Sequence, residues 1–182
     1  MTKKIVDSFE FGVILEQICR EFAENHAQDL KKNQVILVGI HHRGVPLAKR
    51  LAQILRKKYR CPLTLGRLDI TLYRDDVGEI AMQPLVKETD IPCTIEGKIV
   101  LLVDDVLYTG RTIRAALDAL LELGRPRLVR LAVVADRGGR ELPIQPDYYG
   151  TKINTSKTER IQVQTKETDG KDGVWLSTNS KK

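Results

Sequence analysis

The stretch Lys98–Leu117, KIVLLVDDVLYTGRTIRAAL, decides the fold. An apolar run that ends at Val103 is followed at once by two adjacent acids, Asp104 and Asp105. The turn Tyr108–Thr112 then leads into residues with the apolar spacing of a helix. A short β-branched run of this kind predicts a strand that is covered on both faces. The stretch therefore predicts a strand, a turn with polar side chains and a helix.

Further elements are predicted on both sides of this stretch from the spacing of apolar residues. The predicted helices are Ser8–His26 with Ser8 as its cap, a second one over 45–55, and a third over 113–121 that ends before Gly124 and Pro126. The predicted strands are Val35–Ile40, Leu63–Arg74 with a bulge at Gly66, Leu128–Ala135, and a terminal hairpin of Ile161–Thr165 and Val174–Thr178. The polar segment Asp75–Ile91 is expected to be a long hairpin or a mobile loop.

Alternation of strands and helices predicts an α/β fold with a mainly parallel central sheet and helices on both faces. The length of 182 residues fits a single domain spanning 1–182. Ligands of such sheets bind beyond the carboxyl ends of the strands. The residues that follow Ile40, Val103 and Ala135 read HHRG, DDVLYTGRT and DRGGRE, so the site is expected there.

The composition argues against several classes of protein, namely disulfide-rich, zinc-binding and membrane-spanning ones. Lys and Arg outnumber Asp and Glu by 30 to 24, and the net charge of +6 fits either an anionic partner or solubility alone. Three widely spaced cysteines, without a CxxC pair, predict neither a disulfide framework nor a zinc site. There is no signal-peptide pattern at the N-terminus and no apolar run of about 20 residues that would span a bilayer. A cytoplasmic protein is expected.

The polar turn after Val103 has the chemistry of a sugar phosphate site. Carboxylates such as Asp104 and Asp105 can accept hydrogen bonds from ribose hydroxyls or hold Mg²⁺ through water. The amides at the start of the following helix favour an anion, and Gly110 lets the backbone approach it. The alternative is a helix cap with one solvated acid. Neither a P-loop nor a GxGxxG pattern is present in the sequence.

The segments LDITLYRDD, PLVK, DDVLYTGRT, LGRP and DRGGRELPI occur in this order. The third resembles the phosphoribosyl diphosphate (PRPP) signature of type I phosphoribosyltransferases. Together the five resemble the bifunctional pyrimidine operon attenuator/uracil phosphoribosyltransferase family, most closely over about Val35–Ile161. The resemblance implies a type I fold with a small hood and a flexible β-hairpin loop. It also implies transfer of the pentosyl group from PRPP to uracil with Mg²⁺, giving UMP and pyrophosphate, and a homodimer or larger homo-oligomer.

The resemblance also implies roles for individual residues. Asp104, Asp105 and Arg74 would be catalytic, and the two acids would also hold Mg²⁺ through water. The PRPP-binding residues would be Asp104, Asp105, Val106, Leu107, Tyr108, Thr109, Gly110, Arg111 and Thr112. Pyrophosphate would be bound by His42, Arg43, Gly44 and Lys87, and the base by Arg137 and Ile161.

Ordinary structural roles remain open for several of these residues. Arg43 could be a surface arginine, and Arg74 and Lys87 could lie on a solvated hairpin. Ile161 fits a core position as well as it fits a binding role. His42 stands where the family usually has Thr, so only a backbone contact is carried over. The adjacent pair His41 and His42 is not expected to hold a metal.

The family also binds the leader RNA of pyrimidine operons when UMP occupies the site, which attenuates transcription. This chain departs from the expected basic face, with Gly139 in place of His, Gln145 in place of Arg, Thr151 in place of Lys, and Glu16 and Gln17 on the first helix. Arg20, Arg140 and Lys152 keep positive charge and are the candidate RNA contacts. Two functions therefore stand: an enzyme with weak or no attenuator activity, and a UMP-responsive RNA regulator with residual enzyme activity. A transferase for another base is a third.

Overall fold

The computed structural model describes residues 2–75 and 88–178. Within them, a five-stranded sheet runs in the order β3-β2-β4-β5-β6, and every neighbouring pair is parallel. Its strands are β2 (Val35–Ile40), β3 (Thr64–Leu68), β4 (Ile99–Leu107), β5 (Leu128–Asp136) and β6 (Tyr148–Lys152). The main helices are α1 (Ser8–Lys31), α2 (Gly44–Tyr59) and α4 (Arg111–Glu122), and a 3-10 turn, η1, spans Thr71–Tyr73.

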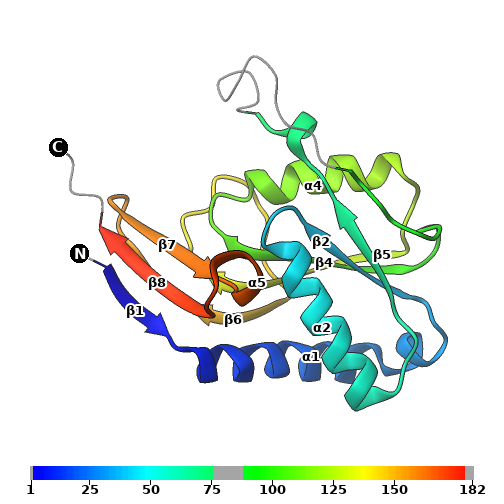
Figure 1. Cartoon of the computed structure of the whole chain (residues 1–182). Coiled ribbons are helices and arrows are strands. Elements are labelled where there is room, and N and C mark those ends of the chain that lie inside the picture. The colour runs from blue at the N-terminus through cyan, green and yellow to red at the C-terminus, as the bar shows by residue number, and fades with distance from the viewer. Residues whose placement is uncertain (1, 76–87, 179–182) are drawn as a thin grey trace.

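A second, antiparallel sheet stands beside the first (Figure 1). Its order is β1-β8-β7, formed by β1 (Thr2–Val6), β7 (Glu159–Gln164) and β8 (Gly173–Thr178), with the short helix α5 (Lys166–Asp169) between the last two. We call this sheet together with α5 the hood. It matches the small hood that the resemblance implied, and β7 and β8 confirm the predicted terminal hairpin.

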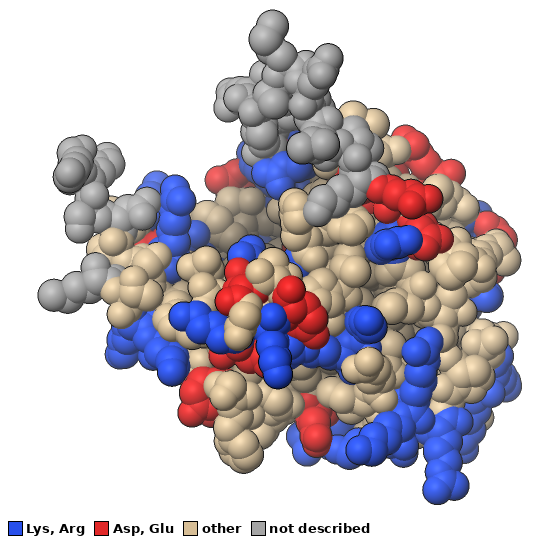
Figure 2. All heavy atoms as spheres, viewed as in Figure 1, with Lys and Arg blue, Asp and Glu red and all other residues tan. Residues whose placement is uncertain are grey.

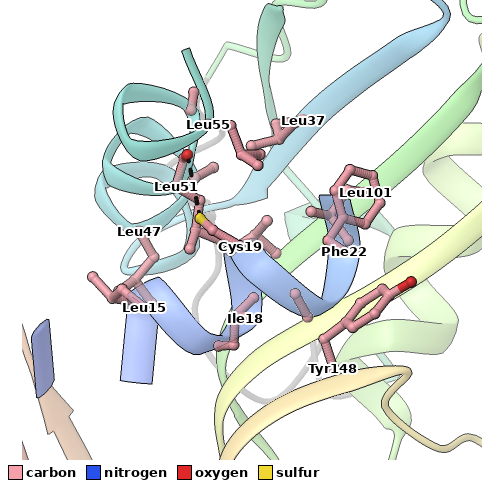
Figure 3. Close-up of a cluster of buried hydrophobic side chains, with 14 of the residues drawn as sticks. Leu15, Ile18, Cys19, Phe22, Leu37, Leu47, Leu51, Leu55, Leu101 and Tyr148 are labelled. Carbon is pink, nitrogen blue, oxygen red and sulfur yellow. Dashed lines mark hydrogen bonds between the residues drawn. The ribbon is translucent and has the colours of Figure 1, made fainter. Parts of the chain in front are cut away.

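Helices cover both faces of the parallel sheet, as predicted, with α1 and α2 on one face and α4 on the other (Figure 1). Alternate residues of β4 show this division, because successive side chains of a strand point to opposite faces. Leu101 packs among the residues of α1 and α2, whereas Leu102 packs among those of α4. Figure 3 shows the first cluster, in which Phe22 of α1 packs with its ring edge-on to that of Tyr148 on β6, at 5.5 Å between the ring centres.

Several predictions about these elements were wrong or incomplete. Asp7, not Ser8, caps α1: its Oδ1 accepts the N–H of Glu10 at 2.9 Å, and the Glu10 carboxylate accepts the N–H of Asp7 at 2.9 Å. Gly66 lies in regular register opposite Val38 and forms no bulge.

The strand predicted over Leu63–Arg74 ends at Leu68, and η1 follows it. The strands β1 and β6 were not predicted, because their short, polar sequences carry little apolar alternation. The expected hairpin or loop over 75–91 lies largely outside the described residues. Among the described residues, no helix is long and apolar enough to cross a membrane.

Candidate active site

The three polar turns predicted to form the site lie side by side. They follow β2, β4 and β5, which are neighbours in the parallel sheet. Parallel strands end at the same edge of a sheet, so their following turns gather there. The β4–β5 register continues past the apolar run, with Asp104 opposite Val133 and Leu107 opposite Asp136. The acids therefore lie within the last part of β4 rather than after it.

Asp104 is a buried carboxyl group, and its neighbour Asp105 is a half-buried one. Asp104 is 7% exposed, and its Oδ1 accepts the N–H of Asp105 at 2.8 Å. Oδ1 of Asp105 in turn accepts the N–H of Val106 at 2.8 Å. Burial raises the pKa of Asp104 well above its usual range, and the neighbouring Asp105 charge adds to the effect. Burial also raises the pKa of Asp105, although the Val106 amide and Arg43 oppose it.

A carboxyl group with a raised pKa is often a functional group whose charged form is stabilised when a ligand binds. Hydroxyl groups and a hydrated cation are ligands that stabilise the charged form of these acids. The positions of Asp104 and Asp105 thus fit the ribose and Mg²⁺ roles expected of them. The alternative of a helix cap does not describe them, because α4 starts only at Arg111 and its first residues are preceded by Gly110 at φ +95°.

A pocket of about 230 Å³ opens at the start of α4. Among the described residues it is lined by Arg74, Asp75, Thr109, Arg111 and Thr112. The first amide of α4, that of Arg111, is in contact with the Thr109 hydroxyl at 3.3 Å. Helix amides, hydroxyls and guanidinium groups around one pocket are suited to a phosphate group.

The two arginines that line this pocket, Arg74 and Arg111, interact with different acidic groups. Arg111 is directed to the rim, where its guanidinium pairs with Glu141 at 2.7 Å and Asp75 at 2.9 Å. Arg74 follows η1 and lies close enough to Asp104 to oppose the rise of its pKa. Arg74 is therefore brought near the acids. Lys87, the other cation expected from this region, lies outside the described residues.

The turn after β2 brings the start of α2 against the end of β4. Gly44 allows this approach, because a Cβ at this position would overlap the carbonyl oxygen of Val103. The peptide bond between His41 and His42 is cis, and His42 is exposed at the tip of the turn. Arg43 precedes α2, and its charge acts on Asp105. Arg43 is thus directed toward the site, although one edge of its guanidinium is bound to Asp169 of the hood.

The turn after β5 joins the parallel sheet to the hood. The guanidinium of Arg137 lies 3.7 Å from the centre of the Tyr108 ring and stacks on it. It also donates to the Thr155 hydroxyl at 2.7 Å and to the carbonyl oxygen of Glu159 at 2.7 Å. Ile161 is half-buried and packs against the core below it. Arg137 and Ile161 therefore lie near one another, at the side of the site that β7 closes.

Arg140 has a different position from the one expected of an RNA contact. Its side chain is 13% exposed and pairs with the buried Asp136 at 2.6 Å. Its other N–H groups point to the carbonyl oxygens of Ile144 at 2.8 Å and Tyr108 at 2.9 Å. Arg140 thus holds the end of β4 and the start of the following turn from within. Arg20 on α1 and Lys152 at the end of β6 are exposed.

Two residues of the site were not found from the sequence. Asp136 lies in the expected turn DRGGRE but was given no role of its own, and Asp169 lies between the two predicted strands of the terminal hairpin, where no site was expected. No local pattern marks Asp169, because its partner Arg43 lies 126 positions away in the chain. Its neighbourhood of acids, KETDGKD, was the only available signal.

Comparison with known proteins agrees with this geometry. The phosphoribosyl transferase domain family matches residues 6–168. A bifunctional protein PyrR from Elusimicrobium minutum is 48% identical over 176 residues, which cover 97% of each chain. Another from Pelotomaculum thermopropionicum is 54% identical over 171 residues, covering 94% of this chain and 93% of that protein. The chain belongs to the bifunctional PyrR family of phosphoribosyltransferases.

Solved structures place this PyrR family member in the type I phosphoribosyltransferase fold. A hypoxanthine phosphoribosyltransferase of Trypanosoma cruzi superposes with a TM-score of 0.71 at 16% identity, covering 97% of this chain and 96% of that one. The Staphylococcus aureus enzyme of the same name gives 0.64 at 18% identity, covering 98% and 93%. Identities this low bear on the fold alone. The fold and the family expected from the sequence are confirmed.

Proposed function

We propose that this PyrR family member is a uracil phosphoribosyltransferase, a glycosyltransferase that moves the pentosyl group of PRPP to uracil and releases UMP and pyrophosphate. The observation that carries the proposal is the adjacent pair of the buried Asp104 and the half-buried Asp105, beside the pocket at the start of α4. The acids that would bind the sugar and the helix amides that would bind its phosphate lie in one continuous segment of the chain. The whole chain would act as one domain, in the cytoplasm, as a dimer or larger homo-oligomer.

The reaction breaks the bond between ribose C1 and the diphosphate oxygen, and the diphosphate leaves with the electron pair. The base nitrogen forms the new bond to C1 and gives up its proton to water or to the released diphosphate. In between, positive charge develops on the sugar ring, and Asp104 and Asp105 lie where they can stabilise it. Arg43 and Arg74 supply positive charge to the departing diphosphate. The protein therefore acts by positioning two substrates and by electrostatics, without a nucleophile of its own.

The two acids fit Mg²⁺ only as part of a larger ligand set. Within residues 2–75 and 88–178, no group of three or more His, Cys, Asp or Glu side chains could hold a metal. Asp104 and Asp105 would hold the ion through water, and the diphosphate oxygens would complete its coordination. When bound, Mg²⁺ neutralises charge on the leaving diphosphate.

The base site is proposed at the carboxyl end of β5 and at β7. The strand β7 lies at an edge of the hood sheet, so alternate residues present backbone N–H and C=O groups that no neighbouring strand uses. The alternating donors and acceptors of uracil can be read by such groups without a charged partner. Arg137 would contact the base from the Tyr108 side, and Ile161 would hold its edge.

A side-by-side assay of three bases tests the proposed activity. With PRPP and Mg²⁺, we expect uracil to be converted to UMP with kcat/KM at least about 100-fold above the values for hypoxanthine and orotate, since a site built for hydrogen bonding rejects wrong bases strongly. Product formation can be followed by chromatography of the nucleotides. Preferential use of hypoxanthine or orotate would overturn the assignment of uracil and favour a transferase for another base.

RNA-dependent attenuation of a pyrimidine operon is the second candidate function, supported by the net charge of +6 and by the exposed Arg20 and Lys152. Against it stand Gly139, Gln145 and Thr151, which replace basic or imidazole side chains of the family pattern. Glu16 carries negative charge on the same helix as Arg20 and pairs with Lys58 at 2.7 Å. Arg140 directs its donors inward. We therefore propose that attenuator activity is weak.

Filter binding of a pyrimidine leader RNA measures this second function. We expect the leader to bind weakly at 0.15 M salt, with an affinity that falls only gradually as salt is raised, because each lost phosphate contact lowers both the affinity and its salt dependence. Addition of UMP is expected to change this affinity little. UMP-stimulated binding that is specific for the leader and steeply salt-dependent would instead establish the chain as a regulator.

A further inference from the structure

The guanidinium of Arg43 is held by a single residue of the hood. Its Nε donates to Oδ2 of Asp169 at 3.1 Å, and its Nη2 donates to Oδ1 at 2.8 Å. This two-point contact fixes the plane of the guanidinium as well as its distance. The Arg43 side chain is 30% exposed and that of Asp169 is 14% exposed, so the contact lies beneath the surface.

The Asp169 carboxylate is itself held in place. Its Oδ2 also accepts the N–H of Thr165, which precedes α5, at 3.0 Å. Each partner stabilises the charged form of the other. Arg43 lowers the pKa of Asp169, and Asp169 raises the pKa of Arg43. Arg43 also acts on Asp105. A fixed chain of charges therefore runs from the hood through Arg43 to the acid at the end of β4.

The contact uses only one edge of the guanidinium. An arginine has five N–H groups, and the edge formed by Nε and Nη2 is the one bound to Asp169. The opposite edge, formed by Nη1 and the second N–H of Nη2, makes no hydrogen bond that we find within the described residues. This edge can form a second two-point contact with an anion, such as two oxygens of a diphosphate.

We propose that Asp169 is a positioning residue for the transfer reaction, which fixes Arg43 with its opposite edge presented to the diphosphate of PRPP. The inference rests on the proposed function, in which Arg43 binds that group. Arginine side chains lose rotamer freedom when they bind, so an arginine that is already fixed binds its anion more tightly. The same ion pair thus joins the hood to the start of α2 and orients the pyrophosphate contact.

The same segment contains a matched control. Arg50, on α2, pairs with Glu167 at 2.5 Å and with Asp172 at 2.8 Å. Figure 2 shows acidic and basic side chains gathered over α5 and the adjoining part of α2. Both arginines fasten the hood to α2, but only Arg43 lies at the end of the parallel strands. If Asp169 only fastened the hood to α2, then loss of the Glu167 charge would have the same effect as loss of the Asp169 charge. If Asp169 positions Arg43, only the loss of the Asp169 charge would weaken PRPP binding.

The test compares Asp169→Asn with Glu167→Gln in steady-state assays and in inhibition by inorganic pyrophosphate. We expect Asp169→Asn to raise the KM for PRPP and the inhibition constant of pyrophosphate about tenfold each, while the KM for uracil changes less than twofold. Glu167→Gln should leave all three constants within about twofold of the parent. Asp169→Glu, which restores the charge, should recover part of the loss.

Arg43→Ala separates failure of this inference from failure of the proposed function. We expect it to raise the KM for PRPP more than Asp169→Asn does. An unchanged KM for PRPP in Arg43→Ala would remove Arg43 from the site and overturn the proposed role on which the inference rests. A raised KM in Arg43→Ala, together with equal constants for Asp169→Asn and Glu167→Gln, would overturn the positioning role alone. Equal losses toward PRPP and uracil in Asp169→Asn would also overturn it, because they indicate general damage.

Discussion

Asp105→Asn is expected to lower kcat at least about 100-fold, because it removes a preorganised charge that faces the developing positive charge of the sugar. The same substitution should not lower the unfolding midpoint at pH 7. Burial raises the pKa of Asp105 in the folded protein, so its ionised form opposes folding at neutral pH. Asn keeps the shape and removes this cost. Steady-state kinetics and thermal unfolding of the unliganded protein measure the two effects.

The effect on stability has a defined pH dependence. A group whose pKa is raised by folding contributes stability below its unfolded pKa and loses it as pH rises through the folded pKa. The midpoint of Asp105→Asn relative to the parent should therefore be highest near neutral pH and should decline as pH falls toward about 4, where free carboxyls titrate. Asp118→Asn, on the exposed side of α4, is the control and should retain full turnover. Parent-like turnover in Asp105→Asn would refute the ribose role.

Gly44→Ala is expected to destabilise the protein by about 2–4 kcal/mol. Within a helix, Ala is ordinarily preferred over Gly by about 1 kcal/mol. Here the added methyl group would overlap the carbonyl oxygen of Val103, so the start of α2 must move away from β4. The steric term outweighs the helix preference because backbone atoms lie on both sides of the contact. Urea unfolding followed by circular dichroism measures the change.

Gly12→Ala on α1 is the matched control for this substitution. Beyond the backbone of its own helix and its chain neighbours, no atom lies within 4 Å of a Cβ at Gly12, and the residue is exposed in the second turn of α1. We expect Gly12→Ala to stabilise the protein by about 0.5–1 kcal/mol, as helix preference alone dictates. A similar stabilisation in Gly44→Ala would show that the approach of α2 to β4 is not as close as described.

The parallel sheet could be predicted because its strands are short apolar runs separated by amphipathic helices. The run that ends at Val103 is typical, since each of its residues is covered from both sides. The edge of the sheet was not predictable in the same way. β6 reads YYGTK and pairs with one strand only, so it needs little apolar sequence. The apolar run likewise predicted an end of β4 at Val103, which is too early, because backbone pairing continues through the acids to Leu107.

Within the site, the sequence located those residues that lie at strand ends. Asp104, Asp105, Arg43 and Arg137 follow from the rule that ligands bind at the carboxyl edge of a parallel sheet. Contacts between distant segments did not follow from it. The pairing of Arg43 with Asp169 depends on how the hood folds back on α2, and the inward orientation of Arg140 depends on Asp136 beneath it. Neither is encoded in a local spacing of residues.

The pairing of β1 with β8 has a consequence for synthesis on the ribosome. β1 hydrogen-bonds only to β8 in its sheet, and nearly the whole described chain separates the two strands. As translation proceeds, the parallel sheet and its acids can assemble while β1 is still unpaired, because β8 has not yet been made. β8 is made after the parallel sheet and then pairs with β1, and the neighbouring hood segment brings Asp169 to Arg43. The ion pair that we propose to orient Arg43 is therefore formed late, after the acids of β4 have been assembled.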